Sequence, residues 1–132
     1  MTQVSNCFAL TIFLLLFTTA SAADFAAFTR AVHLVESGGR TTGPILGDGG
    51  RALGPLQIHR GCWQDSRVGG RYEDVADLAV ATAVLRAYLT RYAPRALAAE
   101  DWTTCARVWN GGPRGASRSA TIGYSMRVVS RL

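Results

Sequence analysis

The 132-residue sequence has no lysine, two histidines and three cysteines. All of its basic residues are therefore arginines, and they exceed the acidic residues to give a net charge of +5. Basic residues do not cluster with aromatic side chains as they do in RNA-binding proteins, so we expect no nucleic-acid partner. Histidines and cysteines are too few to suggest a zinc site, and we expect neither a metal nor another cofactor. The positive charge instead predicts an anionic partner, such as an acidic polysaccharide or membrane surface.

Long hydrophobic runs are also scarce. The run from Phe8 to Phe17 is too short to cross a bilayer, which takes about 20 apolar residues. It precedes a small-x-small sequence, Ala20-Ser21-Ala22, that is typical of signal-peptide cleavage. We therefore predict a signal peptide over residues 1–22, a secreted domain over residues 23–132, and no membrane insertion after cleavage. Because the leader lacks Lys and Arg, a retained membrane anchor is the alternative.

Loss of the leader would leave Cys62 and Cys105 as the cysteines of the mature domain. An even pair in an exported protein suggests one disulfide, and we expect these two residues to pair. Two buried free thiols are the alternative, since cysteine packs well as a small apolar residue.

Hydrophobic periodicity predicts a mostly helical chain. Apolar residues at spacings of three and four indicate a first helix over residues 24–36. The stretch from residue 73 is apolar on nearly every side, which predicts a buried central helix that ends before Pro94. Asp101 is typical of an N-cap for the next helix, and a last amphipathic helix is expected from about residue 119.

Glycine-rich turns interrupt this pattern between the first and the central helix. They predict a short irregular hairpin over residues 40–53, whose weak strands would be Thr41, Thr42, Ile45 and Leu46. The pair Gly54-Pro55 predicts the start of a further helix over residues 56–66. The fold class is therefore α+β, mainly helical, with roughly five helices and one small hairpin in a single domain.

Two carboxylates flank the hairpin in a way that suits glycoside hydrolysis. Glu36 follows Val35 at the edge of the buried stripe, where apolar surroundings favour the neutral form that a general acid needs. Asp48 lies in a polar glycine turn, where it would stay ionised. The alternatives are a solvated helix-end glutamate and an aspartate that only caps its own turn.

Several motifs, in order and spacing, resemble those of one enzyme family. Glu36-Ser-Gly, Gly54-Pro-Leu-Gln57-Ile and Trp63-Gln-Asp are similar to the active-site half of the lysozyme superfamily. With Ala106-Arg-Val-Trp-Asn-Gly-Gly and Thr121-Ile-Gly-Tyr124, they resemble the invertebrate-type (destabilase) lysozymes across nearly the whole mature chain. The resemblance implies a lysozyme-like fold with the hairpin beside an active-site cleft.

The resemblance also implies roles for individual residues. Glu36 would be the proton donor, and Asp48 the nucleophile or cation stabiliser. Gln57 can hydrogen-bond a sugar or the backbone, and Trp63 can stack on a sugar ring or pack in the core. The expected substrate contacts are Gln57, His59, Trp63, Asp65, Tyr88, Asn110 and Gly111.

The function that follows is that of a secreted, monomeric muramidase, which would hydrolyse β-1,4 bonds of peptidoglycan or chitooligosaccharides at the anionic bacterial surface. Three alternatives stay open: a lytic transglycosylase that uses Glu36 alone, an isopeptidase, and a non-catalytic wall-binding protein. The chain departs from the family in keeping few cysteines. It also has Trp109 where a histidine usually precedes the Asn-Gly-Gly turn.

Overall fold

The structure is a computed structural model that describes residues 21–42 and 45–132. The predicted signal peptide lies almost wholly outside the described residues, so its cleavage stays a prediction. Within the described ranges, no helix has both the length and the apolar character needed to cross a membrane.

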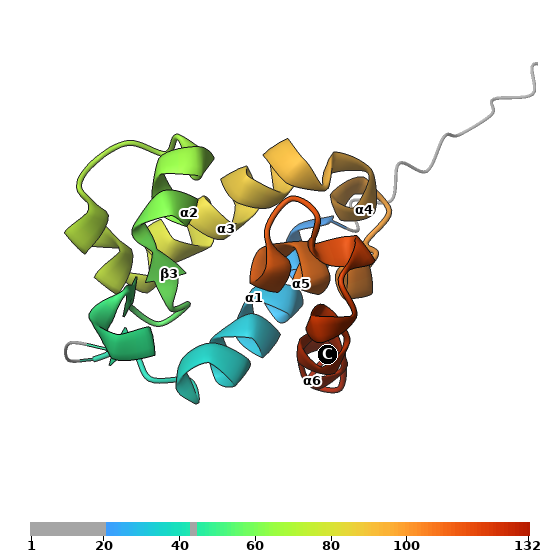
Figure 1. The fold of residues 1–132 in the computed structure, drawn as a ribbon, viewed down its shortest axis with the longest axis horizontal. Coiled ribbons are helices and arrows are strands. Elements are labelled where there is room, and N and C mark those ends of the chain that lie inside the picture. The colour runs from blue at the N-terminus through green and yellow to red at the C-terminus, as the bar shows by residue number, and fades with distance from the viewer. Residues whose placement is uncertain (1–20, 43–44) are drawn as a thin grey trace, which may run out of the picture.

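Helices dominate the described chain, which confirms the predicted mainly helical α+β class (Figure 1). The helices are α1 (Ser21–Ser37), α2 (Arg60–Ser66), α3 (Leu78–Tyr92), α4 (Pro94–Ala98), α5 (Trp102–Gly111) and α6 (Ile122–Val129). Short 3-10 turns are η1 (Asp48–Gly50), η2 (Tyr72–Ala76), η3 (Gly115–Ser117) and η4 (Ser119–Thr121).

The central helix α3 packs against α2, α4 and α5, and these helices surround it in Figure 1. It begins later than the sequence predicts, because Asp77 caps it by accepting a hydrogen bond from the Val80 amide at 3.0 Å. Residues 72–76 form η2 instead. α3 is also less completely buried than predicted, since Ala83 and Arg86 are exposed. The predicted cap of α5 is confirmed, because Asp101 accepts from the Thr104 amide at 3.0 Å.

The small sheet has three strands rather than a single hairpin: β1 (Leu46–Gly47), β2 (Ala52–Leu53) and β3 (Ile58–His59). They are antiparallel in the order β1-β2-β3, with Leu46 opposite Leu53 and Ala52 opposite His59. The predicted strand positions at Thr41, Thr42 and Ile45 are therefore wrong.

The predicted helix over residues 56–66 is also wrong in its first turn. Gln57 has a φ of 49°, which a right-handed helix does not allow, and the next two residues pair with β2. Helix α2 starts only at Arg60. Leu56 and Ile58 are fully buried in this turn, and they join the sheet to a core formed by Phe28, Leu85 and Leu89.

Candidate active site

Glu36 lies in the last turn of α1, where the helix meets α6. The Tyr124 hydroxyl of α6 donates to Glu36 Oε1 at 2.6 Å, a bond that joins residues 88 positions apart in the sequence. Ser37, the last residue of α1, is buried and donates from its hydroxyl to the His33 and Arg40 carbonyl oxygens. The helix end that carries Glu36 is therefore fixed on both sides.

Burial raises the pKa of the Glu36 carboxyl group above its ordinary value. Hydrogen bonds from Tyr124 and from the Trp109 indole act in the opposite direction, as does the positive charge of Arg127. The carboxyl group is thus partly withdrawn from water but has donors that can stabilise its ionised form. This combination suits a group that both gives up and takes back a proton.

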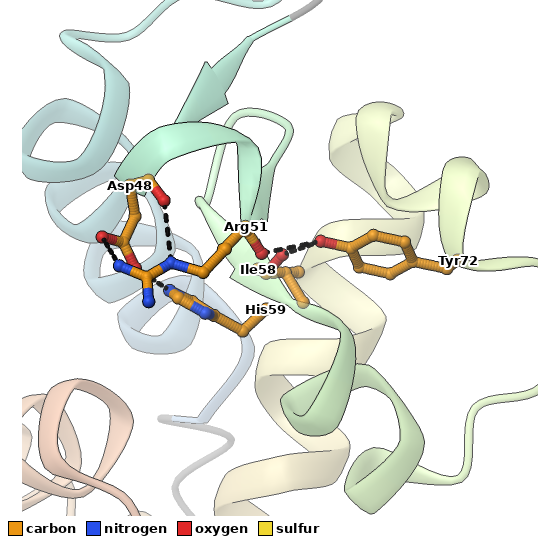
Figure 2. A network of polar contacts seen from close by, with 5 residues as sticks. All are labelled: Asp48, Arg51, Ile58, His59 and Tyr72. Carbon is orange, nitrogen blue, oxygen red and sulfur yellow. Dashed lines mark hydrogen bonds and ion pairs between the residues drawn. The ribbon is translucent and has the colours of Figure 1, made fainter.

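Asp48 is placed by η1, at the tip of the connection between β1 and β2. Its backbone has a φ of 50°, a left-handed conformation that aspartate tolerates better than most residues. Arg51 Nη2 lies 2.8 Å from Asp48 Oδ1, and His59 Nε2 lies 3.4 Å from Asp48 Oδ2 (Figure 2). The carboxylate therefore has one basic side chain on each oxygen.

The interpretation of Asp48 as a residue that only caps its turn does not describe this geometry. The bond from the Arg51 amide goes to the Asp48 carbonyl oxygen, not to the carboxylate. Instead, the carboxylate is paired with two side chains. Arg51 lies between η1 and β2, and His59 lies in β3.

Tyr72 fixes the sheet edge from which His59 and Arg51 project. Its hydroxyl reaches the Ile58 carbonyl oxygen at 2.6 Å and the Arg51 carbonyl oxygen at 3.3 Å (Figure 2). Because Tyr72 belongs to η2, this pair of contacts ties the connection before α3 to the strands that hold Asp48 and its partners.

A pocket of about 250 Å³ separates the two carboxylates, and we call it the Glu36–Asp48 pocket. Five of the nine predicted catalytic and substrate-binding residues line it: Glu36, Asp48, Gln57, His59 and Asn110. The wall is completed by Ala52, Ile58, Cys62 and Trp109. The sheet, the end of α1 and the end of α5 thus converge on one hollow.

Comparisons with known proteins find lysozymes, both by sequence and by structure. A scan against protein-family models found no match. The chain is 37% identical over 104 residues to Lysozyme 1 of Crassostrea virginica, an alignment that covers 77% of this chain but only 56% of that protein. Over 114 residues it is 32% identical to a lysozyme of Magallana gigas, which covers 85% of this chain and 83% of that protein.

Solved structures give the same result. The crystal structure of Tapes japonica lysozyme matches with a TM-score of 0.63 at 26% identity, over 77% of this chain and 85% of that one. Inhibitor-bound lysozyme from Meretrix lusoria matches with a TM-score of 0.63 at 30% identity, over 79% and 87%. The chain belongs to the invertebrate-type lysozyme family. Lysozymes are glycoside hydrolases, and the family places this chain in that enzyme class.

Four residues that the family resemblance suggested as substrate contacts do not line the pocket. Trp63 packs against Tyr72 with ring centroids 6.0 Å apart, and its indole donates to the Gly69 carbonyl oxygen at 3.3 Å. Tyr88 is 5% exposed and meets the Trp109 ring edge-on. Asp65 is exposed outside the pocket, and Gly111 accepts from the Arg118 side chain. Direct contact of these four with substrate stays a prediction that the pocket does not support.

Gln57 lines the pocket but is already engaged as a structural residue. Its side-chain amide donates to the Gly54 and Ile45 carbonyl oxygens at 2.9 and 3.2 Å. Its Oε1 lies so close to Gly47 that a Cβ there would be 1.8 Å away. Gln57 therefore holds the sheet together, whatever it contacts in a substrate.

Sequence reasoning missed Tyr124, Trp109 and Arg51 as residues of the lysozyme site. Arg51 lies three residues after Asp48, so the spacing alone offered a signal for that ion pair. Tyr124 stands in the family-like motif Thr121-Ile-Gly-Tyr124, but nothing local in the sequence connects it with Glu36. Trp109 stands where the family usually has a histidine, and the sequence gives no sign that it contacts Glu36.

The expected disulfide is absent, because Cys62 and Cys105 are both free thiols in the structure. Cys62 lines the Glu36–Asp48 pocket, which borders α5 at Trp109 and Asn110. Cys105 lies one turn nearer the start of α5 and is fully buried in the core. Burial raises the pKa of each thiol to about 12. The alternative of two buried free thiols therefore holds for Cys105, whereas Cys62 is free but only partly buried. The described residues contain no group of three metal-ligating side chains.

Proposed function

We propose that this chain is a secreted muramidase that hydrolyses the β-1,4 bond between N-acetylmuramic acid and N-acetylglucosamine in peptidoglycan. Glu36 acts as general acid and then as general base. Asp48 acts as nucleophile or as stabiliser of the sugar cation. The observation that carries this proposal is the pairing, across one pocket, of a carboxyl group with a raised pKa and a carboxylate held between basic side chains.

The two environments support a division of labour between the two carboxyl groups. Burial favours the protonated form of Glu36, which must give a proton to the leaving oxygen. Asp48 is exposed and pairs with Arg51, and its carboxylate faces the pocket from the side opposite Glu36, where it can oppose the developing positive charge on the sugar. After the first step, the Glu36 carboxylate activates water, and the Tyr124 hydroxyl stabilises that carboxylate.

The experiment is turnover of purified peptidoglycan with analysis of the products. We expect new reducing ends of muramic acid. Glu36→Gln should lower kcat by at least about 100-fold with folding intact, and Asp48→Asn should do so comparably. Glu73→Gln is the matched control, since it makes the same change at an exposed glutamate outside the pocket and should leave kcat unchanged.

Other outcomes would assign a different chemistry to the same pocket. Products with 1,6-anhydro ends, with full activity in Asp48→Asn, would indicate a transglycosylase that uses Glu36 alone. Cleavage of a γ-glutamyl-lysine peptide with no glycan products would indicate an isopeptidase. Tight wall binding without any turnover would indicate a non-catalytic binder.

Secretion is the part of the proposal that rests on sequence alone. Expression of the full chain in a eukaryotic host should release a product that begins at Ala23, and N-terminal sequencing would detect it. Retention of the full-length chain in the membrane fraction would contradict cleavage.

A further inference from the structure

Helix α6 carries apolar side chains on its outer as well as its inner face. Tyr124, Ser125 and Val128 face the interior of the protein. Ile122, Met126 and Val129 are 46%, 67% and 38% exposed, and we call them the α6 apolar row. Their spacings of four and three place them along one line of the helix. Of the exposed large apolar side chains in the described residues, three thus gather on one short helix.

A hollow beside the row extends this apolar surface. It has a volume of about 300 Å³ and is lined by Met126 and Val129 of α6 together with Thr103 of α5. Ser125 and Ser130 complete its wall. Two of the three residues of the row, Met126 and Val129, therefore line a depression between α5 and α6.

The same part of the chain carries the whole net charge of the protein. Residues 107–132 contain five arginines and no acidic residue, whereas residues 1–106 contain nine of each sign. Among the described residues, none of these five arginines forms an ion pair with a carboxylate. Arg114 and Arg131 are exposed, and Arg127 lies on α6 itself.

We propose that the α6 apolar row binds the surface of an anionic phospholipid bilayer, with the exposed Arg114 and Arg131 attracting the lipid headgroups. A helix with apolar side chains on one side and cations beside them lies in the plane of a bilayer interface. The row is about 10 Å long, which suits contact with one leaflet and not a span. An anionic glycan would match the arginines but offers no acyl phase to the apolar row.

A second copy of the chain is a poorer occupant. A twofold contact centred on α6 would bring the same cationic segment against itself, which the absence of acidic residues in 107–132 makes unfavourable. An anionic bilayer has the opposite charge and an apolar interior.

The hollow beside the row is separate from the Glu36–Asp48 pocket. The hollow beside the row is lined by Thr103, near the start of α5, whereas the pocket is lined by Asn110, near its end. These positions are about 10 Å apart along the helix axis. The hollow and the pocket therefore lie towards opposite ends of α5.

The test is co-sedimentation of the mature chain with vesicles made of equal parts of phosphatidylglycerol and phosphatidylcholine. We expect binding at low salt and none to vesicles of phosphatidylcholine alone. The double variant Ile122→Ser with Met126→Ser should bind the anionic vesicles at least about tenfold more weakly. Arg114→Gln with Arg131→Gln should weaken binding by a similar factor, since each cation near an anionic surface contributes to it.

A matched control lies in the loop after α2, on the far side of the molecule from α6 in Figure 1. Arg67→Gln with Val68→Ser removes an exposed cation and an exposed apolar side chain there, and should leave binding unchanged. Far-UV circular dichroism checks that each variant is folded.

A comparison with insoluble peptidoglycan separates lipid from glycan as the partner. The proposal expects the apolar double variant to retain peptidoglycan binding and turnover while it loses vesicle binding. No binding of the wild-type chain to the anionic vesicles would overturn it, as would undiminished vesicle binding by the apolar variant. Loss of a dimer in light scattering, with vesicle binding unchanged, would make the row an interface between copies and would equally overturn it.

Discussion

Glu36 lies between surroundings that favour its acid form and donors that favour its carboxylate. Burial is the larger influence on its pKa, and the Tyr124 hydrogen bond is the first that opposes it. A general acid loses activity as pH rises through its pKa. The basic limb of the pH–rate profile should therefore be set by the pKa of Glu36. Removing a donor to the carboxylate raises that pKa further and moves the basic limb to higher pH.

We therefore expect Tyr124→Phe to shift the basic limb of kcat/KM upward in pH. It should also lower kcat by about fivefold, the equivalent of one net hydrogen bond. Tyr92→Phe is the control, because Tyr92 packs against Tyr88 away from the pocket and should leave the profile unchanged. A basic limb that stays in place in Tyr124→Phe would show that this bond does not act on the catalytic proton.

The two thiols give a second prediction for individual residues. With the pKa of Cys62 and Cys105 raised to about 12, almost no thiolate exists at neutral pH, and thiolate is the reactive form. The folded mature chain should react slowly with a thiol reagent. After denaturation without reductant, both cysteines should titrate, and only one should titrate in Cys62→Ser. Absence of reactive thiols in the denatured chain would show that Cys62 and Cys105 form a disulfide after all.

Residue types and spacing could predict part of this site and not the rest. Glu36 and Asp48 were recognisable because each lies beside a glycine turn within a familiar motif. His59 and Asn110 followed from the resemblance alone. Tyr124 could not be connected with Glu36, because their contact depends on how α1 packs against α6, and no short-range pattern encodes that packing.

At the scale of elements, Gly54 decides whether the sheet can pack against η2. Its φ is 83°, and a Cβ there would lie 2.2 Å from the Val75 carbonyl oxygen. Any side chain at position 54 would therefore strain the backbone and push the Val75 carbonyl group out of its place. We expect Gly54→Ala to lower the free energy of unfolding by about 3 kcal/mol or more.

Gly49 offers a matched control for that prediction. Its φ is also positive, at 64°, but nothing lies within 4 Å of the added Cβ. Gly49→Ala should therefore cost only about 1 kcal/mol, the backbone contribution alone. Urea unfolding of the two variants measures the difference, and equal losses would show that contact with Val75 is unimportant.

Helices with clear caps and periodic apolar faces were predictable, whereas the region around the sheet was not. α1 and α5 were placed correctly by their stripes and by the Asp101 cap. The prediction of a helix from Leu56 failed because Gly54-Pro55 is equally compatible with a turn. Gln57 adopts a left-handed conformation stabilised by its own side-chain bonds to the backbone. One of these bonds reaches Ile45, twelve residues earlier in the chain, so local propensity could not reveal it.

At the scale of the whole molecule, the charge distribution sets how the enzyme meets its substrate. Residues 1–106 are balanced in charge, and residues 107–132 supply the entire +5. An uneven charge of this kind attracts an anionic wall over a distance set by the Debye length, which is about 30 Å at 0.01 M salt and about 8 Å at 0.15 M.

Lysis of whole anionic cell walls should consequently slow by about tenfold as salt rises across this range, because electrostatic steering of the encounter is screened. Cleavage of a neutral chitooligosaccharide at saturating concentration should hardly change, because encounter is then not limiting and the substrate has no charge to attract. Arg114→Gln with Arg131→Gln should flatten the salt dependence for walls and leave the neutral substrate unaffected, since both residues lie outside the Glu36–Asp48 pocket. Equal salt sensitivity on both substrates would place the effect in the pocket, at the Asp48–Arg51 ion pair, and not in the long-range field of the C-terminal arginines.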